Sequence, residues 1–180
     1  MEKTIKIPKI LHEVHGERAV TMDIILPHSI STLASFYFLS ISPSIDFSVV
    51  KTILLFILTY DMVGGVIANF SEGTSRFYAA SRMRRFKFIA LHVLQPTIMW
   101  YLFKDNQTLI LIISAYVVGS AIVVNQIKSL RDQLIVSGTL VVGGVFMFQL
   151  LAGEGPFTLQ FLLTAFILKL PLAWAVRWYG

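Results

Sequence analysis

Residues 60–73 read Tyr60-Asp61-Met62-Val63-Gly64-Gly65-Val66-Ile67-Ala68-Asn69-Phe70-Ser71-Glu72-Gly73. This stretch ends an apolar run that begins near Phe47 and is long enough to cross a bilayer. Asp61 lies inside that run, where a charge costs at least about 2.5 kcal/mol and marks a functional site by default. Asp61, Gly65, Asn69 and Gly73 recur every four residues. On a helix they therefore form one small, polar stripe.

The composition predicts a membrane protein. The chain has 180 residues, of which 56% are hydrophobic and 14% charged, and its mean hydropathy is +0.73. Soluble domains carry about 25% charged residues, so we expect an all-α, polytopic transmembrane helical bundle. The chain has no cysteine, which excludes disulfides and thiolate sites. The net charge is +5, but the basic residues flank apolar runs and no nucleic-acid-binding motif accompanies them, so we expect no nucleic-acid partner.

Apolar stretches divide the chain into two parts. We predict an N-terminal segment, residues 1–20, and a six-helix transmembrane domain, residues 21–180. Each predicted span is close to the ~20 residues that a helix needs to cross a bilayer. The spans lie at about residues 22–42, 47–70, 86–103, 108–127, 133–152 and 157–176. Within the first part, the mixture of charged and apolar residues predicts an amphipathic, surface-lying helix over residues 10–20.

Lys and Arg residues predict which side of the membrane each loop faces. With the N-terminus in the cytoplasm, twelve of them lie on the inner side, and only Lys51 and Lys104 lie on the outer side. We therefore expect a multi-pass protein of the cell membrane with both termini cytoplasmic. The motif Val-Gly-Gly-Val occurs at residues 63–66 and again at residues 142–145. This echo fits either a weak 3+3 inverted repeat or close helix packing alone.

Polar side chains from four predicted spans fall at similar depths in the inner half of the bilayer. They are His28, Asp61, His92, Gln95 and Lys169. Because lipid penalises each of them, we expect them to face inward or to line a water-filled cavity. His28 follows Pro27 near the interface and is assigned a structural role. The predicted ligand-binding residues are Asp61, Gly65, Asn69, His92, Gln95 and Lys169.

Several functions remain open on this evidence. We favour the transport or binding of a small solute, ion or proton in a cytoplasm-facing pocket between spans two, three and six. An intramembrane enzyme acting on a lipid or isoprenoid is the alternative, with His92 or Asp61 as general base. A metal-assisted version would need His92 and Asp61 plus a third ligand such as His28. A non-catalytic subunit is a third interpretation, and Asp61 with Lys169 is alternatively a purely structural pair. No catalytic residue, cofactor or metal is assigned.

Two further partners are considered besides the bilayer and the ligand. The loop after the second span is rich in arginine and has the charge to bind an anionic lipid, although such loops also simply set topology. The residues concerned are Arg76, Arg82, Arg84 and Arg85. Association of copies of the chain into a homo-oligomer is also left open.

The pattern Asp61-x-x-Gly64-Gly65-x-x-x-Asn69, followed by His92-x-x-x-Pro96, carries a family resemblance. It resembles the pattern in uncharacterised small bacterial six-span membrane proteins, and it covers the second and third predicted spans. The resemblance implies a bacterial integral membrane protein and brings no function with it.

Overall fold

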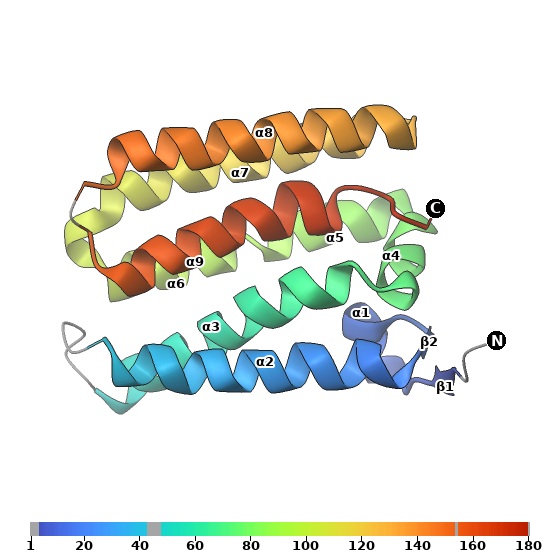
Figure 1. Ribbon diagram of the computed structural model, residues 1–180, viewed down its shortest axis with the longest axis horizontal. Coiled ribbons are helices and arrows are strands. Elements are labelled where there is room, and N and C mark those ends of the chain that lie inside the picture. Colours follow the sequence, from blue (N-terminus) through green and yellow to red (C-terminus); the bar gives the residue numbers. More distant parts are fainter. Residues whose placement is uncertain (1–3, 43–47, 154, 180) are drawn as a thin grey trace.

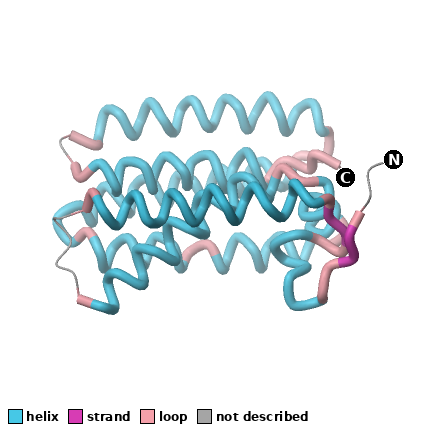
Figure 2. Tube along the Cα trace, turned by 60° about the horizontal axis from the view of Figure 1, so that its bottom comes forward, coloured by secondary structure: helices cyan, strands magenta, loops and turns pink. Residues whose placement is uncertain are grey.

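Long helices lie side by side and run between the same two ends of the molecule (Figure 1). The computed structural model describes residues 4–42, 48–153 and 155–179. Figure 2 shows the same bundle turned, with both described ends of the chain at one end of it. The long helices are α2 (Thr21–Ser40), α3 (Val49–Asn69), α7 (Gln107–Gln126), α8 (Leu130–Leu151) and α9 (Phe157–Leu168).

Shorter elements complete the bundle. A π-helical segment, η3 (Lys169–Trp174), continues α9 directly. Three short helices and one 3-10 turn connect α3 to α7: α4 (Glu72–Ala79), α5 (Arg82–Leu91), α6 (Leu94–Leu102) and η2 (Lys104–Asn106). The chain described here is therefore helical almost throughout, as its composition predicts.

Serine residues define where several helices begin. Ser48, Ser71, Ser81 and Ser129 directly precede α3, α4, α5 and α8. Each Oγ accepts a hydrogen bond from the backbone N–H three residues later, at 3.3 to 3.4 Å. A side-chain cap of this kind stabilises a helix by about 1 kcal/mol, so these boundaries follow from local sequence.

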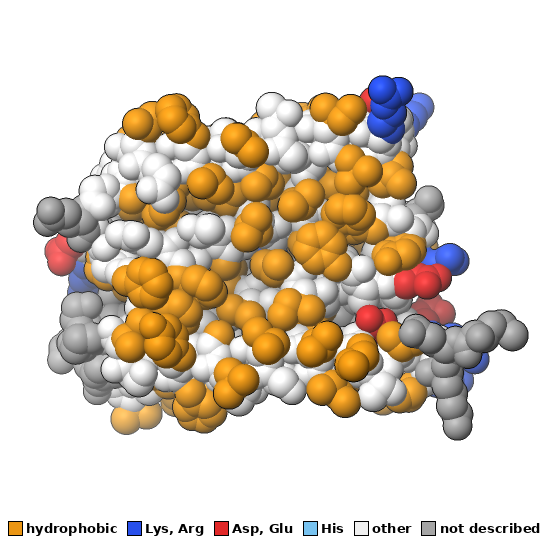
Figure 3. Space-filling model, viewed as in Figure 1, with side chains coloured by type: hydrophobic (Ala, Val, Ile, Leu, Met, Phe, Trp, Pro, Cys, Tyr) orange, Lys and Arg blue, Asp and Glu red, His pale blue; other side chains and the backbone are white. Residues whose placement is uncertain are grey.

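Among the described residues, four helices are long and apolar enough to cross a membrane: α3, α7 with the preceding η2 turn, α8, and α9 with η3. Many large apolar side chains are exposed on the outer surface, and Leu33, Val142 and Leu150 are each at least 67% exposed. Figure 3 shows apolar side chains over the middle of one face and charged ones at its two ends. Such a continuous apolar surface is that of an integral membrane protein.

The other two predicted spans are not among these four helices. The predicted first span is a single 20-residue helix, α2, with Pro27 inside it. The predicted third span is two helices, α5 and α6, separated at His92 and Val93. Pro96 explains the break, because it has no N–H to bond the His92 carbonyl and is tolerated only in the first turn of α6. The structure thus supports four of the predicted spans, and the total of six stays a prediction.

The predicted helix over residues 10–20 is wrong. The segment instead forms a 3-10 turn, η1 (Lys9–Leu11), a single helical turn, α1 (His12–His15), and two strands, β1 (Ile5–Lys6) and β2 (Arg18–Ala19), paired antiparallel. Gly16 ends α1 with a φ of +72°, in the left-handed region that glycine adopts without steric cost. The chain then turns back, and Ile7 N–H donates to the Glu17 carbonyl at 3.1 Å.

The apolar core is centred on α9. Its residues Leu159, Leu162, Leu163 and Phe166 are fully buried, and α9 packs against α3, α7 and α8. Buried residues from these neighbouring helices, such as Leu58 and Ile113, complete the same cluster. Because α9 has core contacts on all sides, the position of Lys169 directly after it is firmly fixed.

Both repeated glycine pairs lie where helices approach closely. A β-carbon on Gly64 would lie 2.6 Å from Ser31 Oγ on α2. A β-carbon on Gly144 would lie 2.9 Å from Tyr116 Cε1 on α7. Close packing of small residues is therefore enough to explain the two motifs, and the 3+3 inverted repeat stays a prediction.

Candidate functional site

Asp61 and Lys169 form an ion pair between α3 and η3. Lys169 Nζ lies 2.9 Å from Asp61 Oδ2 and also donates to the Asp61 carbonyl at 3.0 Å. Only 1% of the Lys169 side chain is exposed, against 48% of the Asp61 side chain. Gly65, one turn further along α3, makes the pair possible because a β-carbon there would lie 2.2 Å from Lys169 Cε. Asp61 and Gly65, which lie on one stripe of α3, therefore together accommodate the Lys169 side chain.

Gln95 contacts the same carboxylate from α6. Its Nε2 donates to Asp61 Oδ2, and the residue is only 6% exposed. Oδ2 therefore accepts from both Gln95 and Lys169, whereas Oδ1 accepts from none of the described residues. Asp61 keeps one oxygen available to a ligand.

His92 ends α5 and is held by a stack of aromatic rings. Its ring stacks on Phe88 with centroids 3.8 Å apart, and Phe88 stacks on Trp174 of η3 at 4.6 Å. His92 Nδ1 bonds the Phe88 carbonyl at 2.7 Å. A carbonyl can only accept, so Nδ1 carries the hydrogen and Nε2 of the neutral ring is an acceptor. Nε2 is buried without a partner among the described residues.

A cavity of about 300 Å³ adjoins the ion pair. At ~30 Å³ per water molecule it has room for about ten waters or a solute of similar size. Asn69, at the end of α3, lines it and has a buried Nδ2 without a partner in the described chain. The wall combines apolar groups with convergent polar ones, as ligand pockets do. It is formed by Glu13, Val14, Pro27, His28, Ser31, Tyr60, Asp61, Gly64, Gly65, Ala68, Asn69, Tyr78, Phe88, Leu91, His92 and Lys169.

The six residues predicted from sequence to bind a ligand lie together. Asp61, Gly65, Asn69, His92 and Lys169 line the cavity, whereas Gln95 reaches it only through its bond to Asp61. The structure places these residues around one space, and it leaves their role in binding as a prediction.

Hydrogen bonds connect three residues, His15, His28 and Tyr60, at this cavity, and sequence reasoning missed these bonds. His15 Nε2 lies 2.9 Å from His28 Nε2, and His28 Nδ1 bonds the Tyr60 hydroxyl. His28 and Tyr60 line the cavity, while His15 is buried at its edge with 2% exposed. Burial, and then the nearby His28, lower the pKa of His15 below its ordinary 6.5. Local sequence spacing gives no signal for this series of hydrogen bonds, because His15 and Tyr60 lie far apart in sequence.

The N-terminal segment closes one side of the cavity. Thr74 Oγ1 donates to the Val14 carbonyl at 2.7 Å, and the Tyr78 hydroxyl donates to the Glu13 carbonyl at 3.1 Å. Burial, and then the Glu13 carboxylate, raise the pKa of Tyr78, which keeps the hydroxyl protonated as a donor. Gly16 and Gly73 meet backbone to backbone, since a β-carbon on Gly16 would lie 2.0 Å from the Gly73 carbonyl oxygen. The fourth member of the predicted polar stripe, Gly73, is thus a docking position for the N-terminal segment.

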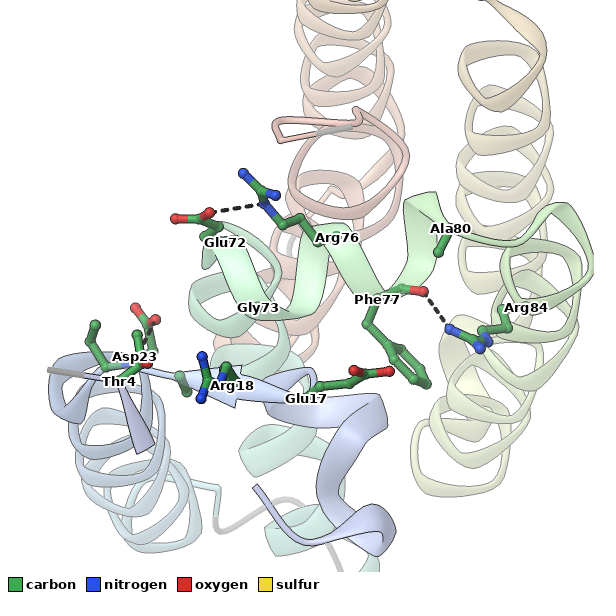
Figure 4. A pocket seen from close by; sticks show the side chains of 12 residues that line it. Thr4, Glu17, Arg18, Asp23, Glu72, Gly73, Arg76, Phe77, Ala80 and Arg84 are labelled. Atoms are coloured by element: carbon green, nitrogen blue, oxygen red, sulfur yellow. Dashed lines mark hydrogen bonds and ion pairs between the residues drawn. The ribbon is translucent and has the colours of Figure 1, made fainter. Parts of the chain in front are cut away.

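The four loop arginines do not form one cluster. Arg76 and Arg84 line a groove of about 480 Å³ that also contains three carboxylates, Glu17, Asp23 and Glu72. Figure 4 shows Arg76 paired with Glu72, at 2.9 Å, and Arg84 bonded to the Phe77 carbonyl. Arg82 and Arg85 line a different cavity. Arg18 also lines the groove in Figure 4, so three arginines face three carboxylates and there is no excess of positive charge for an anion.

In the part of the chain that the structure describes, no three His, Asp or Glu side chains come together in a group that could hold a metal ion. No protein-family model, curated protein or solved structure matches the chain. Function must therefore be argued from the geometry of the cavity itself.

Proposed function

We propose that the chain is a multi-pass membrane protein that binds a small, polar, uncharged solute in the cavity beside Asp61, and transport is the function we favour. The observation that carries this proposal is a space of about 300 Å³ with unpaired polar groups on its wall. Unpaired buried groups are costly, so a bound partner that satisfies them gains affinity.

The unpaired groups define the ligand. His92 Nε2 and Asp61 Oδ1 are acceptors, and Asn69 Nδ2 is a donor. Asp61 and Lys169 already neutralise one another at 2.9 Å, so the pair itself offers no net charge to a free ion, and Glu13 is the further charged residue of the wall. A solute with both donors and acceptors, such as a small polyol or amide, fits this arrangement better than an anion or cation.

The proposal includes the membrane arrangement. In it, α2 and the α5–α6 pair cross the membrane together with the four apolar helices, which makes six spans. Both described chain ends lie at one end of the bundle in Figure 1, as an even number of spans requires. The bias of Lys and Arg assigns that end to the cytoplasm. The cavity then faces the cytoplasm, because the N-terminal segment forms part of its wall.

The test titrates purified protein in detergent with glycerol, erythritol, acetamide and uracil, and with acetate and tetramethylammonium as charged references. We expect at least one neutral solute to raise the melting temperature saturably, and neither charged solute to do so. His92→Phe keeps a ring on the stack and removes Nε2, and Asn69→Leu removes the donor, so each should abolish the shift. His12→Phe is the control, since His12 lies outside this cavity.

Efflux of the stabilising solute from proteoliposomes then tests transport. No saturable shift with any neutral solute would contradict the proposal, and so would a shift that both cavity variants retain. Binding without efflux would support the binding site and contradict the transport function.

An intramembrane enzyme acting on a lipid or isoprenoid is the second candidate, and His92 is the observation that favours it. His92 lines the cavity, its Nδ1 is anchored to a carbonyl, and its Nε2 has no partner among the described residues, which suits a general base. Incubation of the protein with bilayer lipids, followed by mass spectrometry, should reveal a product that His92→Phe does not form. The subunit interpretation expected an exposed small-residue face at Gly143 and Gly144, but Gly144 is buried against Tyr116 and Ile167.

A further inference from the structure

A separate cavity of about 350 Å³ lies where the start of α5, the end of α7 and the C-terminal residues meet. Four of its lining residues are cationic: Arg82, Arg85, Lys128 and Arg177. None of the residues that line it is a carboxylate, and none of these four cations is in an ion pair within the described residues. The cavity therefore concentrates positive charge without a counter-charge from the described chain.

Arg85 is the most informative residue in this cavity. Only 8% of it is exposed, and its Nε and Nη1 are buried without a hydrogen-bond partner among the described residues. Leaving such donors unsatisfied is costly, more so for a charged group. The positive charges of Arg177 and Arg82 lie close enough to act on Arg85. The three arginines thus repel one another in the absence of a bound anion.

Arg177 is held in place independently of any ligand. Its Nη2 donates to the Ile127 carbonyl, and to the Lys128 carbonyl at 3.0 Å, while its backbone N–H donates to Gln133 Oε1 at 3.0 Å. These bonds connect the C-terminal residues to the loop between α7 and α8. One wall of the cavity is therefore preorganised, which lowers the entropic cost of binding.

We propose that this cavity binds a phosphate-bearing anion, either the headgroup of an anionic phospholipid or inorganic phosphate. Planar guanidinium groups donate readily to phosphate oxygens, so a phosphate in this cavity would supply acceptors to the unpaired donors of Arg85 and screen the repulsion from Arg82 and Arg177. The site is separate from the cavity beside Asp61 and does not depend on the solute proposed there. Of the four loop arginines, only Arg82 and Arg85 belong to this site. Arg76 and Arg84 line the groove that contains carboxylates and take no part in it.

Calorimetric titration of delipidated protein in an uncharged detergent tests the proposal. The probes are short-chain phosphatidylglycerol, inorganic phosphate and, as a zwitterionic reference, short-chain phosphatidylcholine. We expect saturable binding of phosphatidylglycerol or phosphate. We expect Arg85→Gln to bind the same probe at least about tenfold more weakly than the unaltered protein. Arg76→Gln is the matched control, since it removes the same charge from an exposed residue outside the cavity.

The two sources of phosphate are distinguished by competition. Phosphatidylglycerol binding that phosphate does not displace assigns the site to a lipid headgroup, and binding of phosphate with displacement of the lipid assigns it to the free anion. If Arg85→Gln loses its helical circular dichroism, Arg82→Gln, which changes an exposed lining residue, replaces it. Absence of binding by both anionic probes would overturn the proposal, as would equal weakening by Arg76→Gln and the cavity variants.

Discussion

The side chain of Lys169 occupies the space in which a β-carbon on Gly65 would lie, since that carbon would be 2.2 Å from Lys169 Cε and 2.7 Å from Nζ. The absence of a side chain at one position of α3 thus lets a lysine from η3 reach Asp61, one turn away. Lys169 is 1% exposed and, like Asp61, lines the cavity. Glycine and lysine form one structural unit that holds the carboxylate beside the cavity.

We first predict that Gly65→Ala destabilises the protein by about 1 to 3 kcal/mol, the usual cost of overpacking. The added methyl group must push Lys169 away from Asp61. Gly119→Ala on α7 is the control, because a β-carbon there meets nothing within 4 Å. Thermal unfolding in detergent measures both. In a Lys169→Ala background the cost of Gly65→Ala should fall sharply, and equal costs in the two backgrounds would contradict a Gly65–Lys169 contact.

The second prediction concerns the ion pair. Asp61→Asn leaves the buried Lys169 ammonium without a counter-charge, so we expect a loss of about 1 to 3 kcal/mol, less than for a fully buried pair because Asp61 is half exposed. Lys169→Met should also destabilise. The double variant should lose clearly less stability than the two single losses together. Additive losses in thermal unfolding would mean that the two groups do not interact.

A third prediction compares two glycines with positive φ. Gly16 has φ +72° and faces the Gly73 carbonyl, whereas Gly153 has φ +51° with nothing within 4 Å of its β-carbon position. Gly153→Ala should cost only the backbone strain, about 1 to 2 kcal/mol. Gly16→Ala adds a backbone clash and should release residues 4–20 from α4. Limited proteolysis of this segment should accelerate in Gly16→Ala alone, and equal rates in the two variants would argue against backbone docking.

Acidic pH should weaken the N-terminal part of the fold. The pKa of His15 is lowered in the folded protein, so the unfolded chain binds a proton more readily. The stability from a neutral His15 is fully present above its ordinary pKa of 6.5 and is lost as the pH falls from there toward the folded value. Melting temperatures at about pH 8 and about pH 5 should differ more for wild type than for His15→Gln. An identical pH dependence would exclude His15 as the titrating group.

Much of the fold is readable from local sequence. Long apolar stretches predict the helices because a bilayer requires every backbone group to be bonded within its own segment. Serines before α3, α4, α5 and α8 mark helix starts, because each serine bonds a backbone N–H only three residues later in the sequence. Polar residues in the predicted spans, such as Asp61, His92 and Lys169, stand out because lipid would penalise them, and the structure places these three around one cavity.

The amino-acid sequence by itself therefore determined the helical class, the apolar outer surface and the set of polar residues that require explanation. Only the tertiary structure decided how they are used: the N-terminal segment docks at Gly16 and Gly73 instead of forming one helix, His15 reaches His28, and Arg85 separates from Arg76. The physical reason is range. Helix formation and capping depend on neighbours within about four residues. Backbone docking and charge clustering depend on groups brought together from distant parts of the chain, and no local pattern encodes which of those groups will meet.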